Sequence, residues 1–105
     1  MENLSQKEWQ NAVAEDKSAI IIDVRTVEEC REGMIEGAIN LDVIETEKFI
    51  AEVEKMDKSS NYYLYCAAGG RSGRACELMT ELGFENTYNL MGGFSCWCGN
   101  TVKND

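Results

Sequence analysis

The amino-acid sequence predicts an α/β fold in which helices cover both faces of a central parallel β-sheet. Four short runs of β-branched, aromatic or other apolar residues, at 19–24, 38–41, 62–65 and 87–90, are the expected strands. Segments with helical spacing of apolar residues separate most of these runs, and the loops are short. Such alternation is typical of a parallel sheet. The run at 19–24 lacks the alternation of a half-exposed strand, as expected for a strand covered on both faces.

The helices in the first half of the chain are marked by capping boxes, in which a Ser or Thr is followed three residues later by a Glu. Leu4 and Trp9 are also spaced to pack across the start of the first helix. The two boxes are Ser5 with Glu8, before a helix at 6–13, and Thr26 with Glu29, before a short helix ended by Gly33.

Two longer helices are expected in the second half of the chain. Apolar residues at 49, 50, 53 and 56 share one helical face, and Thr46 is the expected N-cap of that helix. The spacing of apolar residues predicts a further helix from about Ser72 to Leu82, ended by Gly83. The last residues, 101–105, are expected to fray.

Size and charge limit what the chain can be. Its 105 residues have room for one domain, which we expect to span 1–105. The net charge of −9 opposes binding to nucleic acid or to anionic membranes. No apolar run reaches the roughly 18–20 residues of a membrane span, and the first seven residues lack the pattern of a signal peptide. We therefore expect a cytoplasmic protein with no nucleic-acid or membrane partner, and nothing in the sequence indicates its oligomeric state.

The sequence contains no histidine, which excludes histidine-based triads, dyads and metal sites. A nucleophile in this protein must therefore be activated by other groups. The five cysteines are Cys30, Cys66, Cys76, Cys96 and Cys98. An odd number favours free thiols in a reducing compartment, and the spacing matches no zinc pattern. No metal or organic cofactor is expected.

Cys66 lies where a reactive group is expected, after a strand and before a glycine-containing loop and a helix start. In an open parallel sheet the reactive crevice lies beyond the carboxyl ends of the strands. Gly69 and Gly70 permit positive φ angles, so that successive N–H groups can point at one anion. The helix N-terminus, Arg71 and Arg74 would lower the pKa of the Cys66 thiol. The alternative is an inert thiol buried at a strand end.

The segment Cys66-Ala67-Ala68-Gly69-Gly70-Arg71-Ser72 resembles the active-site loop of single-domain rhodaneses, which are sulfurtransferases. Segments on either side of this loop are similar to two further signatures of the family. They are Ile22–Arg25 with Glu29 and Gly33–Asn40 upstream, and Gly92 and Gly93 with Trp97 downstream. The similarity covers residues 19–98. The family usually has His and Pro at the positions of Met34 and Glu36, so a role for that His is not carried over.

The resemblance implies a three-layer rhodanese-like domain with a core at about 19–98. It also implies a sulfurtransferase that moves sulfane sulfur from thiosulfate or a persulfide donor to cyanide or a thiol. Cys66 would be the catalytic nucleophile and would carry the sulfur as a persulfide. The expected substrate-binding residues are Ala67, Ala68, Gly69, Gly70, Arg71 and Ser72, with Arg71 holding the anionic donor through its fork of N–H donors. A protein persulfide is a further possible donor.

Two other functions stay open at this point. A cysteine-dependent phosphatase binds its anion with a similar loop of N–H groups. In such enzymes five residues separate the Cys from the Arg, whereas four residues separate Cys66 from Arg71. A non-enzymatic sulfur carrier or partner-binding rhodanese module is the second alternative. Turnover of small donors, compared with transfer from a protein persulfide, would distinguish the carrier from the enzyme.

Several polar residues outside the loop are expected to have structural roles. Asp23 and Arg25 end a buried strand, where a carboxylate needs a partner, so they are interpreted as a fold-stabilising pair. Glu28 and Glu29 are interpreted as part of a solvated helix face.

The remaining cysteines divide into two groups. Cys30 and Cys76 are expected to pack in or beside the core. Cys96 and Cys98 flank Trp97, and either is a candidate to resolve the Cys66 persulfide by forming a disulfide with it. Gly92 and Gly93 are expected to let the backbone pass close to the reactive loop.

Overall fold

A five-stranded parallel sheet forms the centre of the computed structural model, which describes residues 1–103. Its strand order is β1-β6-β5-β2-β4, which confirms the predicted fold class. The strands are β1 (Glu2–Leu4), β2 (Ile20–Asp23), β3 (Met34–Ile35), β4 (Ile39–Asn40), β5 (Asn61–Tyr65), β6 (Asn86–Leu90) and β7 (Thr101–Val102). The helices are α1 (Gln6–Glu15), α2 (Val27–Glu32), α3 (Thr46–Val53), α4 (Gly70–Glu81) and the short 3₁₀ helix η1 (Phe94–Cys96).

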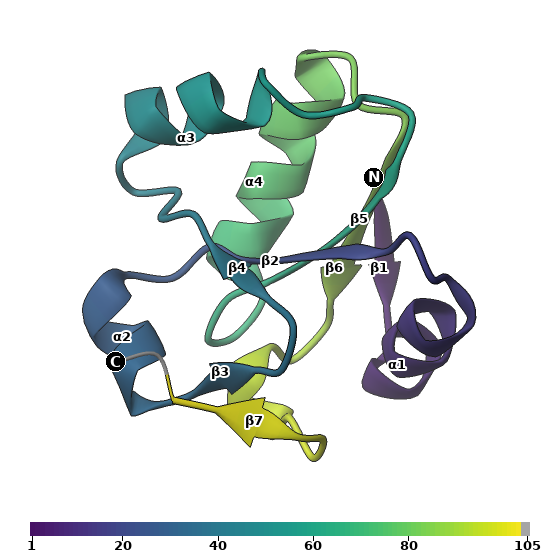
Figure 1. The fold of residues 1–105 in the computed structure, drawn as a ribbon, viewed down its shortest axis with the longest axis vertical. Coiled ribbons are helices and arrows are strands. Elements are labelled where there is room, and N and C mark those ends of the chain that lie inside the picture. The colour runs from purple at the N-terminus through teal and green to yellow at the C-terminus, as the bar shows by residue number, and fades with distance from the viewer. Residues whose placement is uncertain (104–105) are drawn as a thin grey trace.

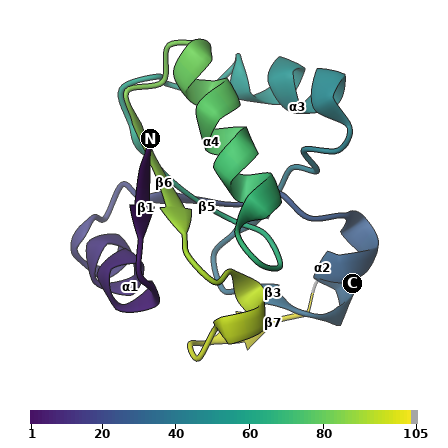
Figure 2. The ribbon, with the colours of Figure 1, turned by 180° about the vertical axis from the view of Figure 1, so that it is seen from behind.

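Helices lie on both faces of the sheet (Figures 1 and 2). Side chains alternate along β5, so Tyr62 and Leu64 pack in the core beneath α3 and α4. Tyr63 and Tyr65 pack on the other face against Trp9 of α1. Within residues 1–103, no helix combines the length and the apolar character needed to cross a membrane.

Both predicted capping boxes are present. The Ser5 hydroxyl accepts a hydrogen bond from the Glu8 N–H, and the Glu8 carboxylate accepts one from the Ser5 N–H. Thr26 and Glu29 repeat this arrangement at α2, which ends at Gly33 as expected. These local bonds fix where both helices begin, independently of tertiary packing.

Helix boundaries differ from expectation where backbone contacts set them. The α3 N-cap is Glu45, not Thr46; Glu45 makes no side-chain capping bond, and the Thr46 hydroxyl donates to the carbonyl of Val43, which precedes the helix. Helix α4 begins at Gly70, two residues before the predicted start.

The short strands β1, β3 and β7 were not expected from the sequence. β1 pairs with β6, and β7 pairs antiparallel with β3, placing Val102 opposite Met34. The expectation that the chain frays from residue 101 is therefore wrong for Thr101 and Val102, while residues 104–105 lie outside the described part. Such strands are too short for a periodic pattern and form only because distant segments meet them.

Asp23 and Arg25 form a buried ion pair at the carboxyl end of β2, as predicted. Arg25 donates from Nη2 to Asp23 Oδ2 at 2.7 Å and from Nη2 to the Gly33 carbonyl at 2.7 Å. The Asn40 amide donates to the carbonyls of both Asp23 and Arg25. Burial alone would lower the pKa of Arg25, but the hydrogen bonds and charge of Asp23 raise it. The pair ties the ends of β2 and β4 to the end of α2.

We expect Arg25→Ala to lower the free energy of unfolding by about 3–5 kcal/mol, because the buried Asp23 carboxyl would lose its ion-pair partner. Urea unfolding followed by circular dichroism measures this change. Lys48→Ala is the matched control, since the Lys48–Glu45 pair is exposed and is worth at most about 1 kcal/mol. Equal losses in the two variants would contradict the role given to the buried pair.

Candidate active site

Cys66 lies at the carboxyl end of β5, where the sequence placed it. β2, β4 and β6 are parallel to β5 and end at the same edge of the sheet (Figure 1). After Cys66 the chain makes a three-residue loop and enters α4 at Gly70. The thiol therefore faces the N-terminus of a twelve-residue helix, where unpaired N–H groups favour negative charge.

The Cys66 sulfur is buried and receives hydrogen bonds. The Gly69 N–H donates to Sγ at 3.1 Å, and the Ser72 hydroxyl lies 3.4 Å from Sγ. Burial is the largest single effect on this thiol and favours its neutral form. Hydrogen bonds from the Ser72 hydroxyl and from the N–H groups of Ser72, Gly69 and Ala68 together outweigh burial and lower the pKa of the Cys66 thiol. The loop thus favours a thiolate without a histidine.

Gly69 is the residue that gives the loop its shape. Its φ is +107°, a region that L side chains rarely adopt, and its backbone lies against Leu90 and Gly92. Gly70 was expected to share this role, but it is the first residue of α4, without positive φ, and a Cβ there would meet nothing within 4 Å. The expectation is therefore wrong for the conformation of Gly70.

The segment after β6 packs directly on the reactive loop, as the two glycines predicted. A Cβ on Gly93 would lie 2.5 Å from the Cys66 carbonyl oxygen, and its φ is +60°. The next two residues donate backbone hydrogen bonds, Phe94 to the Cys66 carbonyl at 2.8 Å and Ser95 to the Ala67 carbonyl at 3.0 Å. These contacts hold the first half of the loop in place.

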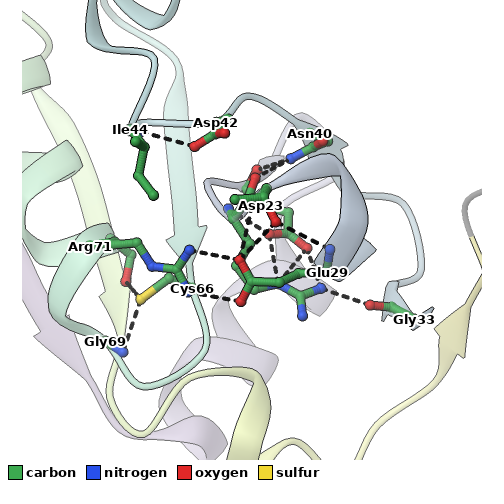
Figure 3. A network of polar contacts seen from close by, with 12 residues as sticks. Asp23, Glu29, Gly33, Asn40, Asp42, Ile44, Cys66, Gly69 and Arg71 are labelled. Atoms are coloured by element: carbon green, nitrogen blue, oxygen red, sulfur yellow. Dashed lines mark hydrogen bonds and ion pairs between the residues drawn. The ribbon is translucent and has the colours of Figure 1, made fainter. Parts of the chain in front are cut away.

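Arg71 is held by an acidic partner that the sequence did not indicate. Figure 3 shows its side chain beside Cys66 with the guanidinium turned toward Glu29 of α2. The two form a bidentate pair, Nη1 to Oε1 at 2.7 Å and Nη2 to Oε2 at 2.9 Å. The hydrogen bonds from Arg71 lower the pKa of Glu29 to about 2. Glu29 is thus part of the site, and its interpretation as a solvated residue is wrong.

Arg74, the other arginine on α4, is not brought to the sulfur. It lies beside Val43 and Thr46, where α4 faces the start of α3. Residues three apart lie on the same helical face, but Arg74 is one turn farther from the helix N-terminus and from Cys66. Arg71 lies beside Cys66 (Figure 3) but is paired with Glu29, and hydrogen bonds from the loop, not an arginine, lower the pKa of the Cys66 thiol.

Ser72 connects the thiol to a second hydrogen-bonded layer that the sequence analysis missed. The Ser72 hydroxyl is hydrogen-bonded to Asn89 Oδ1 of β6, and Asn89 Nδ2 donates to Asn3 Oδ1 of β1 and to the Gly69 carbonyl. Ser72 has one hydroxyl hydrogen for two acceptors, Asn89 and the Cys66 sulfur. Asn89 is 5% exposed, and a buried amide on a strand is the signal that would have pointed to such a network.

The other buried thiols have a different electrostatic environment. Burial raises the pKa of Cys76 to about 12, and burial together with Asp23 raises the pKa of Cys30 to about 12. Both are core residues, as expected. Cys96 and Cys98 are exposed.

Known proteins resemble this chain in both sequence and fold. The family model described as Rhodanese-like domain matches residues 5–100. The thiosulfate sulfurtransferase GlpE of Shewanella oneidensis is 35% identical over 85 residues, which cover 81% of each protein. A sulfurtransferase of Allochromatium vinosum is 29% identical over 91% of this chain and 82% of that protein. The crystal structure of a rhodanese-like domain protein from Staphylococcus aureus matches with a TM-score of 0.85, at 27% identity over the whole of both chains.

We expect Ser72→Ala to raise the pKa of the Cys66 thiol, because it removes the hydroxyl that can turn from Asn89 to donate to the thiolate. At pH 7 the alkylation of Cys66 by iodoacetamide should slow roughly tenfold, since a hydrogen bond to a charged group is worth ~1.5–3 kcal/mol. Peptide mass spectrometry across a pH series follows Cys66 separately from the other thiols. The control is Ser18→Ala, at an exposed serine remote in sequence from the loop, and coincident profiles would argue against the role of Ser72.

Proposed function

The chain belongs to the rhodanese-like domain family, and we propose that it is a sulfurtransferase that carries sulfane sulfur as a persulfide on Cys66. One observation carries the proposal: at the start of α4 the Cys66 sulfur accepts a hydrogen bond from the Gly69 N–H and lies 3.4 Å from the Ser72 hydroxyl. An anionic sulfur nucleophile is what this reaction requires. The relatives named sulfurtransferases support the same reaction class.

The proposed reaction has two displacements. The Cys66 thiolate attacks the sulfane sulfur of thiosulfate, a new S–S bond forms, and sulfite leaves with the electron pair of the bond that breaks. An acceptor such as cyanide or a thiolate then attacks the outer sulfur of the persulfide. Thiocyanate or a new persulfide leaves, and the Cys66 thiolate is restored. Neither displacement requires a histidine, because both nucleophile and leaving group are anions.

The loop has two tasks in this proposal. The backbone N–H groups of residues 67–72 hold the terminal sulfur of the persulfide, as preorganised donors do for a developing anion. Arg71 binds the anionic donor with the N–H groups that Glu29 leaves free, since a guanidinium has five donors. Glu29 orients Arg71 and is a positioning residue.

The charge of this site bears on which sulfur donor the protein uses. Arg71 is already neutralised by Glu29, so a small dianion gains less from it than from a free arginine. A persulfide carried by a low-molecular-weight thiol or by a protein needs only the N–H cradle and is the alternative donor that we propose. Five free thiols suit a reducing compartment such as the cytoplasm.

We expect the reduced protein to gain one sulfur atom when incubated with thiosulfate and to lose it when cyanide is added. Intact-protein mass spectrometry measures both steps. Cys66→Ser is the matched variant and should gain nothing, because the hydroxyl is not a comparable nucleophile at neutral pH. A gain on Cys66→Ser equal to that on the unaltered chain would contradict the proposal. No gain on either, with thiosulfate and with a low-molecular-weight persulfide, would also contradict it.

We also expect Arg71→Ala to lower kcat/KM for thiosulfate at least about tenfold, because it removes a charge-assisted hydrogen bond worth ~1.5–3 kcal/mol. Thiocyanate formation in the presence of cyanide measures the rate. Arg74→Ala removes the same charge from the next turn of α4 and is the control. Equal rates for the two variants would remove Arg71 from the donor site.

A further inference from the structure

Two exposed thiols lie in the segment that follows β6 and are not used by the proposed reaction. Cys96 ends η1, and Cys98 follows it two residues later, beyond Trp97. Cys30 and Cys76, by contrast, are buried in the core. The chain thus presents one buried thiol at the reactive loop and a pair of exposed thiols close together in the chain.

The segment that carries this pair is anchored to the loop that carries Cys66. The N–H groups of Phe94 and Ser95 bond to the carbonyls of Cys66 and Ala67, so η1 begins on the reactive loop itself. Figures 1 and 2 show this segment directly beside the connection from β5 to α4. Cys96 Sγ lies against Gly92, 3.3 Å from where a Cβ of Gly92 would be. A Cβ on Gly69, whose N–H donates to the Cys66 sulfur, would in turn lie 3.8 Å from the Gly92 nitrogen.

The two exposed thiols are themselves held at a fixed spacing. The Gln6 side-chain amide spans them, donating to the Cys96 carbonyl at 2.6 Å and accepting from the Cys98 N–H at 2.8 Å. The Cys98 sulfur turns back toward residue 96 and lies 3.6 Å from its carbonyl oxygen. Residues two apart have Cα atoms at most about 7 Å from each other, and disulfides join Cα atoms about 4.4–6.8 Å apart. The spacing along the chain is thus compatible with a bond between Cys96 and Cys98, which the test below checks.

We propose that Cys96 and Cys98 form an internal dithiol that accepts the sulfane sulfur from Cys66 and reduces it to sulfide. The inference rests on the proposed function, since it needs the Cys66 persulfide. It assigns an acceptor within the chain, and so a second activity: release of hydrogen sulfide without cyanide or an added thiol.

The chemistry balances in two steps. The Cys96 thiolate attacks the outer sulfur of the Cys66 persulfide, so that the S–S bond at Cys66 breaks and the Cys66 thiolate leaves. The Cys98 thiolate then attacks Cys96 Sγ, forming the Cys96–Cys98 disulfide and expelling hydrosulfide with the bonding electrons. Two electrons pass from the two thiols to one sulfane sulfur atom, and the protons of the two thiols go to solvent and to the sulfide. An external dithiol then reduces the exposed disulfide.

Burial decides which sulfur of the persulfide is attacked. Cys66 is 1% exposed, so an incoming thiolate has little access to its Sγ. A persulfide extends that side chain by one S–S bond of about 2 Å, so its outer sulfur lies farther from the buried backbone than Sγ and is the atom that the proposal has Cys96 attack. The disulfide is thus assigned to Cys96 and Cys98, in place of the Cys66 crosslink considered from the sequence.

The test uses the full reduced chain, thiosulfate as donor, and no cyanide, thiol or oxygen. We expect wild type to release about one equivalent of sulfide per chain and to lose two hydrogens, with peptide mapping that places the disulfide between Cys96 and Cys98. Cys96→Ser and Cys98→Ser should release none, and Cys96→Ser should hold the added sulfur on Cys66. Ser95→Ala, at an exposed residue of the same segment, is the control and should behave as wild type.

The double variant C96S/C98S separates the two ways in which this idea can fail. If it gains one sulfur that cyanide removes, while wild type holds its sulfur equally long and releases no sulfide, the dithiol proposal is overturned and the proposed function stands. A disulfide between Cys66 and either exposed cysteine also overturns the dithiol assignment. If the double variant gains no sulfur from thiosulfate or from a low-molecular-weight persulfide, the proposed function itself fails.

Discussion

The lowering of the pKa of a buried thiol without a histidine is the constraint on which the rest of the structure depends. Cys66 is almost fully buried, and burial favours the neutral thiol. The chain offsets this with N–H groups aimed at one point, which requires a parallel sheet that delivers Cys66 to a helix start. It also requires Gly69 at a φ that other residues avoid. The arrangement of β5, the loop and α4 thus determines the pKa of the Cys66 thiol.

Two hydrogen-bonded frames hold that geometry from opposite sides. On one side Asn89 of β6 connects Ser72 to the edge strand β1 and to the Gly69 carbonyl, so β6 and β1 hold the start of α4. On the other side the buried Asp23–Arg25 pair ties β2 to the end of α2, from which Glu29 reaches Arg71. The guanidinium of Arg25 also lies over the Phe94 ring at 4.3 Å. The reactive loop is therefore positioned by the strands and helices around it. Its own residues, Ala67, Ala68 and Gly69, need no large side chains to hold it in place.

The sequence predicted what local patterns encode and missed what depends on distant partners. The capping boxes at Ser5 and Thr26 and the buried strand before Asp23 are readable because the residues concerned lie within a few positions of one another. Glu29 was read correctly as a capping residue, yet its carboxylate also serves Arg71, 42 residues away. The spacing of apolar residues carries no information about an ion pair between residues so far apart in the sequence. Likewise β7 is only two residues long, and only its pairing with β3 makes it a strand.

The charged residues around the loop at 67–72 affect which substrates can approach Cys66. Glu29 balances Arg71, and Asp42 adds further negative charge that raises the pKa of that guanidinium. The whole chain carries a net charge of −9, so a small anion is repelled until it reaches the N–H groups within the loop. Recognition at this site therefore acts at short range, through donors that require contact with the sulfur. The internal dithiol that we propose as acceptor would avoid that repulsive approach, because its segment is hydrogen-bonded to the loop through Phe94 and Ser95.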